Sequence, residues 1–172
     1  MDKIVKIFIL ILVCLSCSNK ERFERDRNKI IFRYCKFITV DFDARVMKVN
    51  YAGLTYTDII HISNTEDSLI INSFNRNKIY KVNGELAYPD CPWLMPSFED
   101  RIDIYVDEKL KSRTLINSNP NCVFNKPSIS SQEYRIIHFG NDIKKALENN
   151  KDFKRALDTL HKFQKEKKAL FL

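Results

Sequence analysis

The chain has 172 residues, of which 44% are hydrophobic and 30% are charged, and these values are typical of a single globular domain. Its three glycines, Gly53, Gly84 and Gly140, lie too far apart to form the glycine-rich phosphate loops of the common nucleotide-binding motifs. Neither H-E-x-x-H nor G-x-S-x-G occurs. The sequence therefore excludes the enzyme classes that depend on these motifs, and it indicates neither a cofactor nor a metal site.

The formal net charge of +7 is concentrated at the two ends of the chain. Residues 18–33 hold six basic and three acidic residues, and residues 140–172 hold nine basic and five acidic ones. The body between them, residues 34–139, is nearly neutral, with twelve basic and thirteen acidic residues. Nucleic-acid binding requires a basic surface on the folded body, so we expect no nucleic-acid partner.

Residues 1–17 have the layout of a secretory signal peptide. Lys3 and Lys6 precede an apolar run over residues 7–15, and Ser16 and Cys17 follow it. A helix that spans a bilayer needs about 20 apolar residues, so this run is too short for a permanent transmembrane anchor. We expect the segment to be removed by cleavage.

The sequence Leu15-Ser16-Cys17, followed by the polar residues 18–20, resembles the lipobox of bacterial lipoproteins. The resemblance implies that Cys17 is acylated, as with palmitate, and becomes the first mature residue. Two or three acyl chains hold a protein firmly at a membrane. The implied location is the bacterial cell envelope, at the outer membrane, with the membrane contacted through the N-terminal lipid.

Residues 18–29 are almost wholly polar and predict a charged tether, and residues 30–172 predict one globular domain. Runs rich in β-branched and aromatic residues predict three consecutive antiparallel strands, at residues 30–42, 45–51 and 54–62.

The segment after residue 62 fits two interpretations. Ser63 with Glu66 forms a capping-box pattern, and Ile70 and Phe74 lie one helical turn apart, which favours a helix. The alternative is a hairpin that turns at residues 64–67. Asn83-Gly84 then predicts a tight turn that pairs residues 78–82 with residues 85–88.

The second half of the chain predicts a hairpin, a loop, a short strand and a long helix. Residues 100–106 and 111–117 flank an Asp107-Glu108 turn, residues 118–132 are rich in turn formers, and residues 134–139 indicate a strand. Residues 142–168 have helical periodicity, with a break at Asn149-Asn150. The predicted fold is α+β, an antiparallel sheet with a short middle helix and a C-terminal amphipathic helix. The alternative is an all-β barrel or sandwich with one C-terminal helix.

This order of lipobox, charged tether, strands, short helix, strands and terminal helix resembles the small uncharacterised lipoproteins of Bacteroidota-like bacteria. The resemblance lies mainly in the N-terminal signal and the overall layout, and it assigns no catalytic residue.

Three cysteines remain once the signal peptide is removed and Cys17 is acylated. Cys91 and Cys122 lie in loops rich in Pro and Asn, and we expect them to form a disulfide in an oxidising compartment. Cys35 lies in a predicted strand, where a cysteine is usually a small buried apolar residue.

The histidines and carboxylates predict no catalytic or zinc site. His61 and His138 lie in predicted strands and His161 in the terminal helix, a scattered arrangement that does not indicate metal binding. Solvation at turns and strand edges accounts for the neighbouring carboxylates, which are Asp41 with Asp43, Glu99 with Asp100 and Asp103, and Asp107 with Glu108.

Residues 88–98 hold three of the five prolines and the only tryptophan. Prolines stiffen a segment and reduce the entropy that it loses on binding. One hypothesis is a preformed contact site for a partner, made by Trp93, Leu94, Met95 and Phe98. The alternative is that these apolar side chains fold back over the sheet as part of the core.

These features favour a lipid-anchored protein of the cell envelope that acts as a non-catalytic binding, accessory or immunity-type module with an envelope protein as partner. The alternative is an envelope hydrolase whose catalytic residues are dispersed along the sequence.

Overall fold

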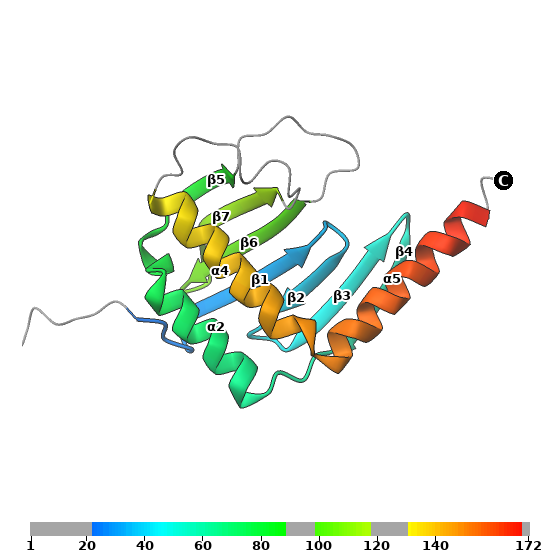
Figure 1. Cartoon of the computed structure of the whole chain (residues 1–172), viewed down its shortest axis with the longest axis horizontal. Coiled ribbons are helices and arrows are strands. Elements are labelled where there is room, and N and C mark those ends of the chain that lie inside the picture. Colours follow the sequence, from blue (N-terminus) through cyan, green and yellow to red (C-terminus); the bar gives the residue numbers. More distant parts are fainter. Residues whose placement is uncertain (1–21, 89–98, 118–130, 170–172) are drawn as a thin grey trace, which may run out of the picture.

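In the residues that the structure describes, a seven-stranded sheet carries three helices on one of its faces (Figure 1). The computed structural model describes residues 22–88, 99–117 and 131–169. The elements are β1 (Asn28–Tyr34), β2 (Ile38–Asp41), β3 (Val46–Tyr51), β4 (Leu54–Ile59), α2 (Asn64–Arg76), the 3-10 helix η1 (Ile79–Lys81), β5 (Gly84–Tyr88), β6 (Glu99–Val106), β7 (Lys109–Asn117), α4 (Ser131–Glu148) and α5 (Lys151–Ala169). The expected α+β class is confirmed.

The strand order is β4-β3-β2-β1-β6-β7-β5, and all neighbours are antiparallel except β5 and β7. Strands alternate their side chains between two faces, so the residues of β1 divide between a helix-covered face and an opposite face. Ile30 and Phe32 of β1 are opposite Ile104 and Ile102 of β6, and all four are buried under the helices. We call the opposite side of the sheet the uncovered face.

The first predicted strand, residues 30–42, is two strands joined by a tight turn. Cys35 and Lys36 have φ angles of 45° and 68°, and the Phe37 N–H donates to the Tyr34 carbonyl. Two consecutive left-handed residues give the twist that a two-residue hairpin requires. The prediction of one continuous strand with Cys35 inside it was wrong, because neither residue of the turn is a Gly, Asn or Asp that would have indicated it.

The helical interpretation of residues 63–76 is confirmed. The Ser63 hydroxyl accepts from the Glu66 N–H, and the Glu66 carboxylate accepts from the Ser63 N–H at 2.6 Å. These reciprocal bonds satisfy main-chain donors that the first helical turn leaves unpaired. Ile70 and Phe74 are buried against the core.

The predicted Asn83-Gly84 hairpin is wrong. Residues 79–81 form η1 after Lys78, which has a φ of 52°, and β5 pairs with β7 in parallel rather than with the preceding residues. Gly84 has a φ of 79° and changes the direction of the chain. The strand that it begins, β5, then pairs in parallel with β7 at the edge of the sheet.

The β6–β7 hairpin is confirmed, with Asp107 and Glu108 at φ angles of 48° and 64°. A register shift at Ile104/Tyr105 interrupts the pairing of its two strands. Such an irregularity is a β-bulge, which increases the local twist of the hairpin.

Residues 134–139, predicted as a strand, belong to α4. Ile136, Phe139, Ile143 and Leu147 of this helix are buried at intervals of three and four residues. Gly140 lies within this helix, and a Cβ at this position would lie 2.8 Å from the Ile116 side chain of β7. The missing side chain lets the helix approach the sheet closely.

The predicted break at Asn149-Asn150 is confirmed, and it separates α4 from α5. The Asn150 Oδ1 accepts from the N–H groups of Asp152 and Phe153 at 3.0 Å each, as a helix N-cap does. The chain therefore changes direction, and α5 packs over β2, β3 and β4 while α4 lies beside α2.

Part of the predicted tether contacts the domain. The Phe23 ring packs edge-to-face on Phe74 at 5.2 Å between centroids, and the Phe23 N–H donates to Asn75 Oδ1 at 2.8 Å. Asn28 and Lys29 already belong to β1. The chain is thus fixed to the domain from residue 23 onward.

Candidate functional site

Most of the residues singled out in the sequence lie outside the described part of the chain. The lipid attachment at Cys17, the disulfide and the apolar contact site therefore stay predictions. The residues concerned are Cys17, Cys91, Cys122, Trp93, Leu94, Met95 and Phe98.

Cys35 has a free thiol in the β1–β2 turn, next to the buried Asp100. Its N–H donates to Asp100 Oδ1 at 2.9 Å. Burial of the thiol, followed by the nearby Asp100 carboxylate, raises the pKa of Cys35 to about 11. Since the thiolate is the reactive form, these surroundings disfavour a nucleophilic role.

The three histidines are dispersed. His61 lies between β4 and α2, where its Nδ1 is 2.9 Å from Asp152 Oδ2. The His138 ring lies 4.1 Å from the Tyr134 ring in α4, at an interplanar angle of 48°. The strand positions predicted for His61 and His138 were both wrong. His161 lies on α5. Within the described ranges no group of three or more His, Cys, Asp and Glu residues is placed to hold a metal ion.

Solvation at turns and strand edges accounts for only some of the carboxylates. Asp41 caps the β2–β3 turn and pairs with Lys29 at 2.7 Å, as expected for a turn residue. Asp100 and Asp103 are 0% and 1% exposed, so this explanation was wrong for both. Asp100 pairs with Lys144 of α4 at 2.5 Å. Both buried carboxylates are matched by basic side chains.

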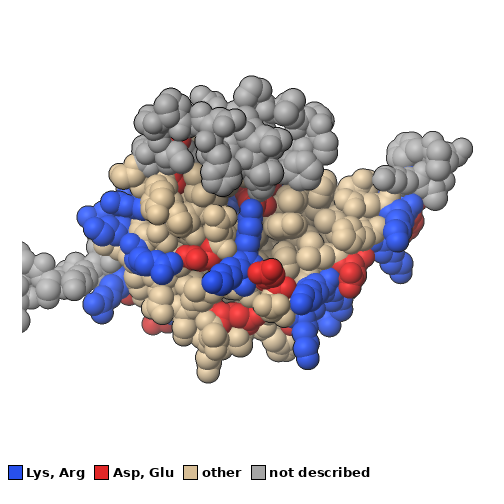
Figure 2. All heavy atoms as spheres, in the orientation of Figure 1, with Lys and Arg blue, Asp and Glu red and all other residues tan. Residues whose placement is uncertain are grey.

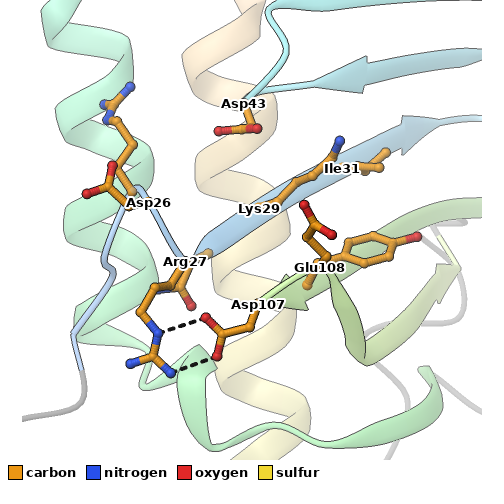
Figure 3. Close-up of a pocket in the computed structure, with 10 residues that line it drawn as sticks. Asp26, Arg27, Lys29, Ile31, Asp43, Asp107 and Glu108 are labelled. Atoms are coloured by element: carbon orange, nitrogen blue, oxygen red, sulfur yellow. Dashed lines mark hydrogen bonds and ion pairs between the residues drawn. The ribbon is translucent and has the colours of Figure 1, made fainter.

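A polar pocket of about 480 Å³ lies on the uncovered face, beside the first residues of β1 (Figure 3). Arg27 forms two hydrogen bonds with Asp107, at 2.9 and 2.8 Å, and this pairing lowers the pKa of the Asp107 carboxyl. Lys29, Asp43 and Glu108 also line the pocket. Its central carboxylate is held ionised, which does not suit a general acid.

A second pocket, of about 510 Å³, forms a groove between α4 and α5 above the sheet. We call it the α4–α5 groove. Tyr34 and Phe153 meet edge-to-face at 5.6 Å between centroids, and with Phe32 and Leu157 they provide its apolar surface. The remaining lining residues are polar and belong to the two helices, and they are Asn141, Lys144, Lys145, Glu148 and Lys154. Figure 2 shows the uncharged surface between the helices and the basic side chains along α5.

The lining of the α4–α5 groove carries a net positive charge, with three lysines against Glu148. Lys144 is paired with Asp100, so Lys145 on α4 and Lys154 on α5 are the cations that remain for a ligand. Apolar surface with a few polar groups is typical of ligand pockets, and the volume lies in their usual range of about 300–1,000 Å³. The groove suits an apolar group that carries negative charge.

Comparison of the chain with protein-family models, with curated proteins and with solved structures found no match. Among the helices that the structure describes, none is both long and apolar enough to cross a membrane.

Proposed function

We propose that this chain is a lipid-anchored protein of the bacterial cell envelope and acts as a non-catalytic binding module. The signal-like residues 1–17 and the lipobox resemblance at Cys17 support the anchor. With Phe23 fixed on Phe74, only five residues separate Cys17 from the domain. At about 3.5 Å per residue the anchor would hold the domain within roughly 20 Å of the lipid surface.

The α4–α5 groove carries the binding part of the proposal. Its partner is a segment of an envelope protein that presents an apolar side chain flanked by acidic residues. Charge complementarity favours this chemistry, because Lys145 and Lys154 approach the apolar surface from two different helices. Residues 140–172, which supply both helix faces, hold nine basic and five acidic residues, and this excess would accelerate encounter with an acidic segment.

The anchor is tested by metabolic labelling with a palmitate analogue. Wild type should take up the label and fractionate with membranes, whereas Cys17→Ala should do neither. Cys14→Ala is the matched control, because it changes the neighbouring cysteine of the signal. An unlabelled wild type would contradict the lipoprotein assignment.

The groove is tested by photo-crosslinking in the native envelope. A crosslinker at Leu157 should capture one defined partner, and the double variant Lys145→Glu/Lys154→Glu should lose it. Lys162→Glu/Lys165→Glu is the control, since it makes the same charge change on α5 outside the groove lining. If both double variants lost the partner equally, general basicity and not the groove would account for binding.

If the crosslinker at Leu157 captured the same proteins as one at Thr57 on the uncovered face, the groove would have no role. The partner's contact segment is identified by mass spectrometry of the crosslinked peptide. A segment without acidic residues would contradict the proposed chemistry.

A further inference from the structure

Three arginines from three adjacent strands gather on the uncovered face of the sheet. Arg33 of β1 is directly opposite Arg101 of β6, and Asp103 of β6 is directly opposite Arg113 of β7. Ile102 and Ile104, the neighbours of Asp103, point to the helix-covered face. Arg33, Arg101, Asp103 and Arg113 therefore share the other face, and we call them the arginine cluster.

The single carboxylate of the arginine cluster is already fully used. Asp103 Oδ1 lies 3.0 Å from Arg113 Nε, and Asp103 Oδ2 lies 2.9 Å from Arg101 Nη2. The Asp103 side chain is only 2% exposed, so water reaches little of it. Asp103 neutralises one of the three guanidinium charges.

The other carboxylates near the cluster do not neutralise the two remaining guanidinium charges. Glu99 pairs with Lys36 at 2.8 Å. Glu85 is 3.4 Å from Arg113, but its side chain is 75% exposed. An ion pair so exposed to solvent contributes little. Lys36 and Glu99 balance each other, and Glu85 is too exposed to offset Arg113, so the excess positive charge of the arginine cluster remains.

Arg33 is the cation left over. Within the described ranges its side chain forms no ion pair, and its Nε is buried with no hydrogen-bond partner. Like charges directly opposite on neighbouring strands destabilise a sheet. A buried guanidinium N–H without an acceptor costs free energy as well. Burial and the adjacent Arg101 together lower the pKa of Arg33, which reports the same unfavourable surroundings.

We propose that the arginine cluster binds a phosphate-type oxyanion between Arg33 and Arg101. Guanidinium groups present several N–H donors in a plane and match the oxygens of phosphate two at a time. The three arginines and one aspartate of the cluster leave an excess of two positive charges, which a divalent phosphate balances better than a monovalent carboxylate does. The anion would accept from the terminal N–H groups of Arg33 and Arg101 and reduce the repulsion between the two opposed arginines.

The site adjoins the polar pocket of Figure 3. Ile31, which lines that pocket, is directly opposite Asp103, and Tyr105, which also lines it, is two residues along β6 from Asp103. A phosphate in the cluster would therefore lie next to an existing hollow, where the remainder of a larger phosphorylated ligand has room.

Thermal unfolding of the full-length chain in detergent tests the proposal. Inorganic phosphate at about ten times its dissociation constant should raise the Tm by on the order of 3–5 °C above chloride of equal ionic strength. Arg33→Met keeps the aliphatic stem and removes the charge. The variant should unfold at or above the wild-type Tm in chloride, and phosphate should no longer raise it.

Lys162→Met is the matched control, because Lys162 is an exposed residue of α5, on the helix-covered side of the sheet and away from the cluster. It should retain the full phosphate shift. An equal phosphate shift in Arg33→Met and wild type would overturn the proposal. So would the absence of any difference between phosphate and chloride in wild type. A shift of the same size with acetate would overturn the preference for a divalent oxyanion.

Discussion

The side-chain amide of Asn150 donates a hydrogen bond of 2.8 Å to the main-chain carbonyl of His61. The same amide lies 3.1 Å from Glu66 Oε1, and Asn150 Oδ1 caps α5. One side chain thus joins the start of α5 to the segment that leads from β4 into α2. Asn150 is 5% exposed, so these bonds are protected from water.

Asn150→Ala should lower the free energy of unfolding by about 2–3 kcal/mol. The change removes an N-cap, worth about 1 kcal/mol, and leaves buried main-chain groups without partners. Chemical denaturation measures the loss. Asn149→Ala, at the exposed neighbouring position, should stay within about 0.5 kcal/mol of wild type. Equal losses in the two variants would contradict the role assigned to Asn150.

Gly140→Ala should destabilise the protein by about 1–2 kcal/mol, because the new Cβ would overlap Ile116 Cδ1 at 2.8 Å. In an Ile116→Val background, which lacks that atom, the same change should be neutral or stabilising by up to about 1 kcal/mol, since Ala favours a helix over Gly. An Ile102→Val background serves as control, because Ile102 Cδ1 lies at an ordinary 3.5 Å. Chemical denaturation of wild type, Gly140→Ala, Ile116→Val and the double variant gives the coupling energy between the two positions. A coupling energy of zero would contradict this account of the packing.

The thiol of Cys35 should react slowly and destabilise the fold at alkaline pH. Its pKa rises from 9.0 to about 11 on folding, so the folded state favours the protonated thiol. The resulting stabilisation is complete below pH 9.0 and is lost as the pH rises toward 11. The Tm of wild type should therefore fall more steeply across this range than that of Cys35→Ala.

The rate of alkylation gives an independent measure of how strongly the fold protects the Cys35 thiol. At pH 8 the Cys35 peptide should react with iodoacetamide roughly a hundredfold more slowly in the folded protein than in urea, as followed by mass spectrometry. Equal rates would show that burial does not protect the thiol.

Asp103→Ala should cost about 3–5 kcal/mol of stability, the usual result of removing one partner from a buried ion pair. Stability is lost because the three guanidinium groups repel one another once no carboxylate lies between them. Adding Arg33→Met should restore part of the stability. Asp43→Ala, at an exposed turn, is the control and should change stability by less than about 0.5 kcal/mol.

The Cys91–Cys122 disulfide remains a prediction from the sequence. Closing this span should stabilise the chain by about 3–4 kcal/mol on the chain-entropy estimate. Non-reducing peptide mapping should recover the two cysteines in one linked peptide. A peptide that links Cys35 to either of them would contradict both the pairing and the free thiol of Cys35.

Local chemistry in the sequence predicted the elements whose ends carry their own signals. Ser63 with Glu66 predicted α2, and the pair Asp107-Glu108 predicted the β6–β7 turn. The features that the sequence did not predict depend on residues whose backbone conformation differs from the usual preference of their residue type. Cys35 and Lys36 form a left-handed turn without Gly or Asn, and Gly140 lies inside a helix because the sheet is close.

The two candidate sites depend on tertiary geometry that the sequence does not specify. Helical periodicity places Lys145 and Lys154 on predicted helices, but the direction of α5 after Asn150 decides that they border one groove. Arg33 and Arg101 are 68 residues apart in number and meet through the pairing of β1 with β6. The registers of strands distant in sequence follow from the assembled core and not from local propensity.

The first strand of the domain lies in the interior of the sheet, and this gives the N-terminus a mechanical property. Residues of β1 are bonded to β2 on one side and to β6 on the other. A pulling force applied through the N-terminal segment would act along β1 and would load both rows of hydrogen bonds in shear at the same time. An edge strand would instead release its bonds one after another. An anchor on the N-terminal segment, as proposed above, would therefore hold the domain by the strand that tension is least able to peel from the sheet.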